Sequence, residues 1–342
     1  VSENFNVNRL FGLVLESLGQ KTGKESREAR TRKLQEKLEG KTYVMVLDDV
    51  WNENLGMWDD FMGSLKGINT TTGNFILVTT RKHQVASIMA TSSSHCSLGE
   101  LSDDECWLIF KEKAIGRHEV LEESRAIGLE IAQICQGLPL VACTVGGMLR
   151  NKRREEWISA LKRGLQGLTE KENNVMHILK LSFDNLPCPA LKRCFAYGSI
   201  FSKDSVMERD QLIQLWMAEG FLQTHSRSMD MEEIGNMFFN ILLQNSLFQD
   251  VEWDEYDRIL SCKMHDLVHD LAQSMQNSQR DEDDIHPIRH LALENCGEET
   301  PSILNKRFRY IRSLFSVYDI SEDVSYFISL RVLNLSSTDL TL

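Results

Sequence analysis

Two short segments that are apolar along their length constrain the fold of this chain more than any other feature. They are residues 41–48 (KTYVMVLD) and 74–80 (NFILVTT), and both have the length of a strand. Apolar and polar side chains do not alternate in them, so both faces of each strand are expected to be buried. This pattern is typical of parallel sheets that helices cover on both sides.

The segments around these strands complete an α/β unit. Helices are predicted at residues 8–18 and 26–39, and Gly40 follows the second helix at a position where a glycine commonly ends one. A third short strand is predicted at 95–98. Strands that alternate with helices indicate an α/β fold, so we assign residues 1–98 to this unit.

Residues 99–185 have a mainly helical pattern. Ser102 and Glu105 form the S-x-x-E capping box that opens a helix. In the segment GLPL (137–140), Gly137 can end one helix, and Pro139 cannot simply continue it. Including those that follow in the next domain, the predicted helices lie at residues 106–115, 122–136, 139–150, 173–183, 188–197 and 209–219.

A β-hairpin is predicted within residues 186–275. The strands SLFQDVE (246–252) and RILSCKMH (258–265) flank a charged turn, and the sequence MHDLVHDLAQSM that follows is predicted to be a helix. Helices combined with a two-stranded hairpin indicate a winged-helix domain. The acidic stretch 276–284 contains few apolar residues, so it is predicted to be a linker.

The last part of the chain, residues 276–342, contains three similar segments. Leu291, Leu314 and Leu333 occupy equivalent positions in them, and the final segment fits L-x-x-L-x-L, the strand of a leucine-rich repeat. We therefore expect the start of a leucine-rich-repeat solenoid. The segments are RHLALENC (289–296), IRSLFS (311–316) and LRVLNLSSTDL (330–340).

The charge of the chain argues against nucleic acid as a partner. It has 38 lysines and arginines against 50 aspartates and glutamates, a net charge of −12. Residues 200–275 contain 5 basic and 14 acidic residues, a local balance of 5 − 14 = −9. Binding to nucleic acid depends on basic side chains that release counterions from the phosphates. A winged-helix domain that binds nucleic acid is the alternative function for this part of the chain.

Cysteine usage and hydropathy bear on the cellular compartment. The eight cysteines are scattered without a C-x-x-C pair, as expected for reduced thiols in the cytoplasm. No apolar run approaches the roughly 18 to 20 residues of a membrane span, and the N-terminus lacks the layout of a signal peptide. We expect a cytoplasmic protein without an integral membrane segment. Because the chain opens at Val1 without a methionine, we also expect a fragment.

The triplet Gly40-Lys41-Thr42 resembles the end of a phosphate-binding loop, but its context is reversed. The motif G-x-x-x-x-G-K-[ST] follows a strand and precedes a helix, so that helix amides face the phosphates. Here Gln35 stands where the first glycine belongs, and the triplet lies between a helix and a strand. We conclude that the triplet is no phosphate loop and that these 342 residues contain no Walker A motif.

Asp48 and Asp49 lie at the end of the first predicted strand, and Arg81 follows the second. Ligands of open α/β sheets bind at the carboxyl ends of parallel strands. An apolar run followed by two aspartates is the Walker B arrangement, in which the first reaches Mg²⁺ and the second orients an attacking water. The planar guanidinium of Arg81 is suited to a terminal phosphate. The alternative is two acids that cap a strand end in solvent.

The segment from His265 to His269 reads HDLVH, which differs by one methylene from the H-E-x-x-H helix of zinc hydrolases. No convincing third ligand follows it, and an aspartate is too short for the usual geometry of the base. We therefore favour a histidine at a helix start that serves the fold or binds an anion.

Six motifs in a fixed order make the chain resemble the plant nucleotide-binding leucine-rich-repeat (NB-ARC) immune receptors. Trp51 after the acid pair, and the stretch CFAYGSIF, resemble the subclass with a coiled-coil rather than a Toll-type N-terminal domain. The motifs span the chain: VMVLDDVW (44–51), FILVTTR (75–81), LGELSDDECWLIFKEKAI (98–115), CQGLPLVACTVGGML (135–149), LKRCFAYGSIFSKD (191–204) and KMHD (263–266) before the leucine repeats.

The resemblance implies a role for each matching residue of the α/β unit. Asp48 is implied to be the residue that binds magnesium, and Asp49 its catalytic neighbour. Arg81 is implied to be the sensor of the γ-phosphate. The fold implied is a partial P-loop NTPase sheet, followed by a helical domain, a winged-helix domain and the first leucine-rich repeats.

The resemblance also implies a nucleotide site in the helical and winged-helix domains. Pro139, in the motif formed by Gly137, Leu138, Pro139 and Leu140, is implied to pack on the adenine side of the nucleotide. His265 is implied to contact the β-phosphate of ADP and so to hold the closed state. The implied cofactors are ADP or ATP with Mg²⁺.

The implied function is an ADP/ATP-controlled switch of an intracellular immune receptor, with at most slow ATPase activity in the full-length protein. Its partners are implied to be a pathogen effector or a guarded host protein, bound by the repeats, and other copies of itself on activation. The chain departs from the family because the phosphate loop is missing, so we expect residues 1–342 to bind ADP or ATP weakly. An interaction-only fragment without nucleotide binding is the alternative.

Overall fold

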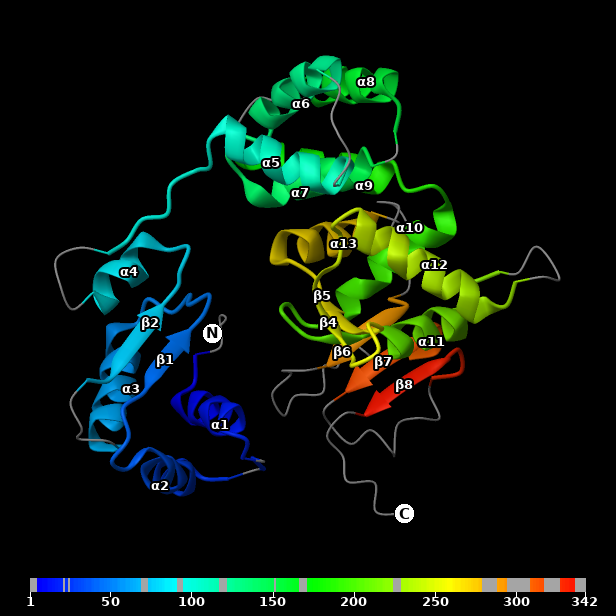
Figure 1. The fold of residues 1–342 in the computed structure, drawn as a ribbon. Helices are drawn as coiled ribbons and strands as arrows, with labels where there is room; N and C mark the ends of the chain where they lie inside the picture. The colour runs from blue at the N-terminus through cyan, green and yellow to red at the C-terminus, as the bar shows by residue number, and fades with distance from the viewer. Residues whose placement is uncertain are drawn as a thin grey trace. The chain divides into compact units, whose positions relative to one another are not determined.

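The chain forms two compact units, residues 1–99 and 100–342, in a computed structural model (Figure 1). Each unit is described by itself. The structure describes residues 5–20, 22–23, 25–68, 73–90, 95–116, 122–150, 152–165, 171–223, 229–278, 288–293, 308–316 and 327–335.

The first unit contains the two predicted strands as a parallel pair. β1 (Val44–Leu47) and β2 (Phe75–Val78) are hydrogen-bonded in a register that aligns Val44 with Phe75 and Leu47 with Val78. The parallel pairing confirms the sequence prediction. The helices of this unit are α1 (Val7–Ser17), α2 (Arg27–Leu38), α3 (Leu55–Ile68) and α4 (His83–Met89).

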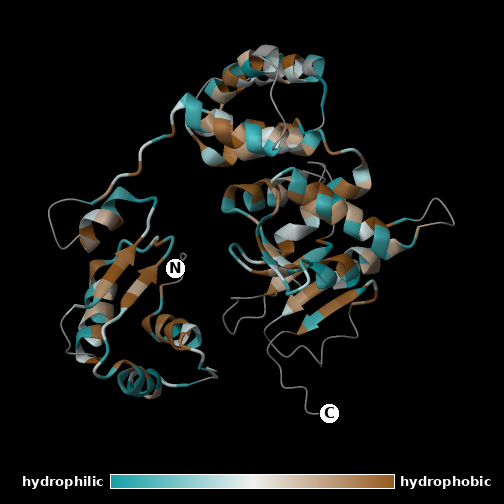
Figure 2. Cartoon of the chain, in the orientation of Figure 1, coloured by the Kyte–Doolittle hydropathy of each residue, from teal (hydrophilic) through white to brown (hydrophobic). Residues whose placement is uncertain are grey.

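The prediction that both faces of β1 and β2 are buried is wrong. Met45 and Leu47 are buried in the core of this unit, whereas the side chains of Val44 and Val46 are 68% and 59% exposed. Successive side chains of a strand point to opposite faces, and the described core lies on one face only. The apolar colour of both strands in Figure 2 therefore includes an exposed apolar row, which Phe75 and Leu77 of β2 extend.

Two other expectations for this unit need correction. The third strand predicted at 95–98 is absent: residues 95–100 are irregular, and the side chain of Leu98 is 95% exposed. A short apolar run becomes a strand only where a neighbouring strand can pair with it. Helices α3 and α4 were not predicted from the sequence. Trp58, Phe61 and Leu65 on α3 supply much of the core.

The second unit begins with helices that pack on one another. Ser102 and Glu105 form the predicted capping box at the start of α5, with Ser102 accepting a hydrogen bond from the Glu105 amide. The core of this region is built around Trp107, Phe110 and Trp157. The helices are α5 (Asp103–Ala114), α6 (Glu122–Ile134), α7 (Pro139–Met148), α8 (Arg154–Leu165) and α9 (Lys171–Asp184), of which α8 was not predicted.

Helix α7 approaches its neighbours at backbone distance. A Cβ atom added to Gly146 would lie 2.7 Å from Cβ of Lys113 on α5, and one added to Gly147 would lie 2.7 Å from Cα of Asn245. Real Cβ atoms do not come so close, so only glycine fits at either position without a shift. These two adjacent glycines of α7 thereby allow Lys113 of α5 and the end of α12 to approach α7 at neighbouring positions.

The predicted hairpin is present within a winged-helix arrangement. β4 (Gln249–Trp253) pairs antiparallel with β5 (Ile259–Lys263), and β3 (Met207–Glu208) pairs with the other edge of β5. The surrounding helical segments are α10 (Pro189–Tyr197), η1 (Gly198–Ile200), α11 (Arg209–Glu219), α12 (Met231–Gln244) and α13 (Asp266–Ser278).

Two details of this region differ from the predictions made from the sequence. Helix α12 was not predicted, although Phe238, Phe239 and Leu242 place its apolar side in the core. Residues 276–278 of the predicted linker belong to α13, and the rest of that stretch, 279–284, lies outside the described residues.

Three strands near the end of the chain form a parallel ladder. Leu291, Leu314 and Leu333 lie opposite one another in its register, as their sequence positions predicted. Residues 294–296 and 336–340 of the predicted segments lie outside the described residues. The strands are β6 (His290–Leu293), β7 (Ser313–Ser316) and β8 (Val332–Leu335), and η3 (Phe308–Tyr310) precedes β7.

A buried polar network joins this ladder to the winged helix. The Ser313 hydroxyl donates to the carboxylate of Glu219, whose side chain is fully buried, and accepts from the Tyr197 hydroxyl at 2.9 Å. His290 lies 3.5 Å from the same carboxylate, and Gln276 of α13 contacts the other ring nitrogen of His290 at 2.8 Å. The network links α10, α11 and α13 to strands β6 and β7.

The cysteines in the described part of the chain are free thiols. Burial raises the pKa of Cys135 and of Cys262 to about 12, so both stay protonated at neutral pH. Among the residues described above, none of the helices has both the length and the apolar character needed to cross a membrane.

Replacing Gly147 by alanine tests the close approach of α7 to the end of α12. We expect Gly147→Ala to lower the free energy of unfolding by about 1–3 kcal/mol, because the new methyl group meets backbone atoms that cannot move independently. The matched control is Gly63→Ala in α3, where the added Cβ meets nothing within 4 Å. That change should stabilise by roughly 0.5–1 kcal/mol. Equal effects in thermal unfolding would contradict the assignment.

Glu219 should make the docking of the ladder sensitive to acid. Burial raises the pKa of a carboxyl group, but contacts from His290 and Ser313 outweigh it and hold the pKa of Glu219 below its ordinary value of 4.5. Such a group stabilises the fold fully above its unfolded pKa, and the contribution is lost as the pH falls through the lower folded pKa.

We therefore expect the protection of residues 313–316 against hydrogen exchange, taken relative to the intrinsic exchange rate at each pH, to fall as the pH drops below about 4.5. Glu219→Gln should lower this protection at neutral pH and flatten its dependence on pH, whereas Glu255→Gln on the exposed hairpin turn should do neither. Unchanged protection in Glu219→Gln would show that the network does not hold the ladder.

Candidate functional site

A first candidate site lies in the first unit, where β1 and β2 end. The Arg81 guanidinium donates from Nε and a terminal nitrogen to the two carboxylate oxygens of Asp49, at 3.2 and 3.1 Å. The hydroxyl of Thr79 donates to Asp48 and accepts from the Asp49 amide at 2.9 Å. The structure thus brings Asp48, Asp49 and Arg81 together, because parallel pairing places the carboxyl ends of both strands at one edge.

The electrostatics at this edge favour the charged form of Asp49. Burial raises the pKa of Asp49, but hydrogen bonds from Trp51 and Arg81 outweigh it and hold that pKa below its ordinary value. The guanidinium carbon of Arg81 lies 4.5 Å from the centre of the Trp51 ring, a cation–π distance. Asp49 has φ of 48°, in the left-handed region. Trp51, Val50, Arg81 and Lys82 line a hollow of about 200 Å³.

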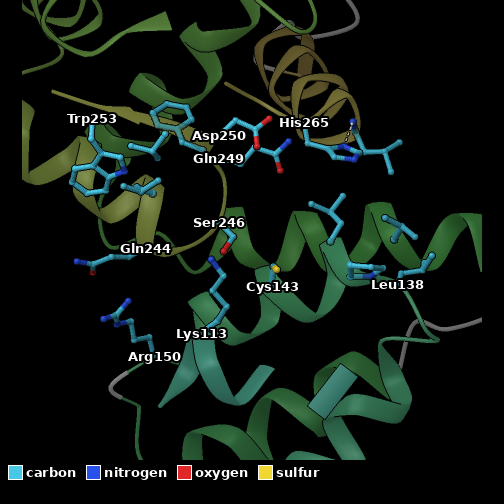
Figure 3. Close-up of a pocket in the computed structure, with 17 residues that line it drawn as sticks. Lys113, Leu138, Cys143, Arg150, Gln244, Ser246, Gln249, Asp250, Trp253 and His265 are labelled. Carbon is cyan, nitrogen blue, oxygen red and sulfur yellow. Dashed lines mark hydrogen bonds between the residues drawn. The ribbon is translucent and has the colours of Figure 1, made fainter. Parts of the chain in front are cut away.

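A second candidate site is a pocket of about 850 Å³ within the second unit (Figure 3). This volume lies within the range of small-molecule sites, which are mostly apolar with a few polar groups. Helices α5, α7, α9 and α12, strand β4 and the start of α13 contribute to its wall. The lining residues are Lys113, Leu138, Pro139, Leu140, Cys143, Arg150, Val175, Leu243, Gln244, Ser246, Phe248, Gln249, Asp250, Val251, Trp253, His265 and Leu267.

Three residues singled out in the sequence line this one pocket. Pro139 is the first residue of α7, where its missing amide hydrogen costs nothing, and Leu138 precedes it as the N-cap. His265 lies just before α13, and its Nδ1 accepts a hydrogen bond from the Leu267 amide at 3.2 Å. In the neutral ring, the proton is therefore on Nε2, which is a hydrogen-bond donor.

Gly137 is not among the residues that line the pocket. It has φ of 74° after α6, and its carbonyl accepts a hydrogen bond from the Leu101 amide at 3.0 Å. A Cβ atom at this position would lie 2.7 Å from the Leu101 carbonyl oxygen. Its observed contacts fasten the turn before α7 to the segment before α5.

His265 and His269 do not form the metal site that was weighed in the sequence. His269 is buried, and its Nε2 lies 2.7 Å from the carbonyl oxygen of Phe201. A ring nitrogen at that distance from a carbonyl is a donor, so it is not free to bind a metal. His269 serves the fold, as the favoured interpretation of this segment stated.

Sequence reasoning missed most of the polar residues of the pocket. Lys113 and Arg150 lie on or beside helices that were predicted, but nothing in the local sequence separates them from other surface cations. Ser246 directly follows the C-cap of α12, a helix that was not predicted. Their convergence depends on the packing of α7 and could not be read from spacing.

Comparison with known proteins connects both units to one family. Residues 1–119 match the NB-ARC domain, and residues 200–272 match the disease resistance protein winged helix domain. The putative disease resistance protein RGA1 of Solanum bulbocastanum is 36% identical over 343 residues, 99% of this chain and 33% of that protein.

Two proteins of Arabidopsis thaliana are also similar. The putative disease resistance RPP13-like protein 1 is 38% identical over 80% of this chain and 25% of its own length. Disease resistance protein RPM1 is 34% identical over 72% of this chain and 27% of its own length. The chain spans about a third of the length of the Solanum relative and less of these two.

The ion pair of Arg81 and Asp49 yields a direct test. We expect Arg81→Gln to raise the pKa of Asp49, because two of the contacts that lower it are lost while its burial remains. The pKa is measured from the carboxyl ¹³C shift during an acid titration. Lys82→Gln is the control, since Lys82 pairs with Glu53 at 2.7 Å. An unchanged Asp49 pKa in Arg81→Gln would contradict the pairing.

Proposed function

The chain belongs to the NB-ARC family of plant disease resistance proteins, and we propose that it forms part of an ADP/ATP-controlled switch in an immune receptor. In the proposed resting state, ADP holds the helical and winged-helix domains closed. Exchange for ATP then favours the open state. A ligand shifts such an equilibrium only through its different affinities for the two states.

One observation carries this proposal. Leu138 and Pro139 line the same pocket as His265, although the two segments are more than 120 residues apart in the chain. An apolar wall beside a proline suits a nucleotide base, and a histidine Nε2–H donor suits a phosphate oxygen. We assign Gly137 a positioning role, because it fastens the turn from which Leu138 and Pro139 enter the pocket.

For the first unit we propose metal-binding and catalytic roles. Asp48 is the proposed Mg²⁺ ligand, Asp49 the proposed catalytic neighbour and Arg81 the proposed sensor of the terminal phosphate. Carboxylate oxygens suit a hard cation such as Mg²⁺, and the side chains of Asp48 and Asp49 lie at one strand edge with Arg81. Bound Mg²⁺ would offset the negative charge of the phosphates. Asp49, held ionised by Arg81, would orient a water.

Partners and location follow from the same proposal. The parallel ladder would be the start of the repeats that bind a pathogen effector or a guarded host protein, and activation would lead to self-association. The cytoplasm suits free cysteine thiols such as those of the described residues. The switch of the whole protein would then be set by nucleotide and read out through assembly.

Two other functions would give different results. An interaction-only fragment would bind neither ADP nor ATP through the pocket of Figure 3. A winged-helix module that binds nucleic acid would need a basic surface, whereas residues 200–275 carry a balance of −9. A salt-dependent mobility shift with duplex DNA would be required for that second function.

Two ligands can separate the proposed roles of Pro139 and His265: ADP, which has phosphate groups, and adenosine, which has none. Titrations of ADP and of adenosine extend to millimolar concentration, because residues 1–342 by themselves are expected to bind weakly. His265→Ala should weaken the binding of ADP by about tenfold or more, since a hydrogen bond to a charged group contributes about 1.5–3 kcal/mol, and should leave the binding of adenosine unchanged. Pro139→Ala should weaken the binding of both ligands.

The control is His95→Ala, an exposed histidine outside the pocket. Equal affinities of all variants for ADP would contradict the proposed pocket, and the absence of any ADP binding would favour the interaction-only fragment. Calorimetric titration measures each of these affinities.

A further inference from the structure

The pocket of Figure 3 has a second polar region away from His265. Ser246 lines it with a side chain that is only 9% exposed, and its hydroxyl has no hydrogen-bond partner within the described part of the chain. A buried hydroxyl without a partner costs free energy. In natural structures, such a group calls for a ligand or a water.

Lys113 and Cys143 lie at the same region. In Figure 3 the ammonium end of Lys113 and the hydroxyl of Ser246 point toward one another, with the Cys143 thiol beside them. The contacts of α7 explain this convergence, because Gly146 abuts the stem of Lys113 and Gly147 abuts Asn245, the residue before Ser246. Two adjacent glycines thus bring the cation and the hydroxyl into one corner.

The electrostatics of Cys143 support the position of the ammonium group. Burial raises the pKa of the Cys143 thiol, and the positive charge of Lys113 opposes that rise. The charge of Lys113 is therefore felt inside the pocket. Arg150 adds a second cation to the lining, while Asp250 lies toward Gln249 and His265 in the view of Figure 3.

The backbone at Ser246 is consistent with a constrained site. Ser246 has φ of 55°, the left-handed conformation that usually falls to glycine after a helix. A serine there is less favourable than a glycine. Glycine at position 246 would therefore keep the turn and remove the hydroxymethyl side chain.

We infer that Ser246 and Lys113 form an oxyanion-binding subsite, which takes the phosphate group of a small molecule seated in the pocket. The serine hydroxyl donates one hydrogen bond to the anion, and the ammonium of Lys113 provides charge and further donors. Arg150 stands at the same wall as a second source of charge. This subsite is distinct from the His265 end and needs no nucleotide base.

Inorganic phosphate is the probe, and Cys143 is the reporter. The alkylation rate of Cys143 by iodoacetamide is followed by peptide mass spectrometry in phosphate and in chloride of equal ionic strength. A bound anion should slow the reaction by about threefold or more, because it shields the thiol and offsets the charge that favours the thiolate. Exposed Cys96 is the internal reference, whose rate should not change.

The variants identify the residues responsible. Ser246→Gly and Lys113→Gln should abolish the protection by phosphate, whereas Lys111→Gln on the same helix, outside the pocket lining, should retain it. The effect is taken as the ratio of the alkylation rates with and without phosphate, because Lys113→Gln by itself slows the alkylation of Cys143. Phosphate that protects equally in all variants, or not at all in the unmodified chain, would overturn the inference.

Two further arms separate this subsite from the proposed nucleotide site. His265→Ala should retain the protection by phosphate, and its loss would place the anion at His265 and overturn the inference. Protection by ADP that depends on Ser246 would identify the anion as a nucleotide phosphate. Protection by phosphate alone would identify a separate phosphorylated ligand, and either result sustains the subsite.

Discussion

The backbone-distance packing of α7 is the constraint on which the second unit depends. Gly137 fastens its entry to the segment before α5, and Gly146 and Gly147 let α5 and the end of α12 approach it. Dense packing of this kind leaves little freedom to shift a helix without cost. The pocket exists because these contacts hold Pro139 at one end of α7 and Arg150 just beyond the other.

Helix α13 connects that pocket to the parallel ladder. His265 lies immediately before its first residue, and Gln276 near its other end contacts Ser199 and His290, each at 2.8 Å. Glu219 and Ser313 complete the buried network, in which every bond replaces hydration that burial removes. Buried polar groups thus join the winged helix to the ladder. Separating any one of them from the network would cost the hydrogen bonds that it makes there.

Much of the architecture could be predicted because its determinants are local. The capping box at Ser102, the proline that starts α7 and the leucine spacing of the ladder all act over a few residues or one repeat. Helices α3 and α12 were missed, and the third strand and the second buried face of β1 were predicted wrongly. Those features depend on which neighbours pack nearby, and an apolar run does not specify its neighbours.

By itself, the sequence identified the two parallel strands, the hairpin and the spacing of the ladder, and also the residue types of the strand edge, since Asp48, Asp49 and Arg81 follow strands whose pairing is parallel. It also identified Pro139 and His265 as unusual. Only the tertiary structure decided that these two line one pocket and that Ser246 and Lys113 line it as well. The physical reason is that such convergence arises from the packing of helices distant in sequence, where single glycines set the distance of approach.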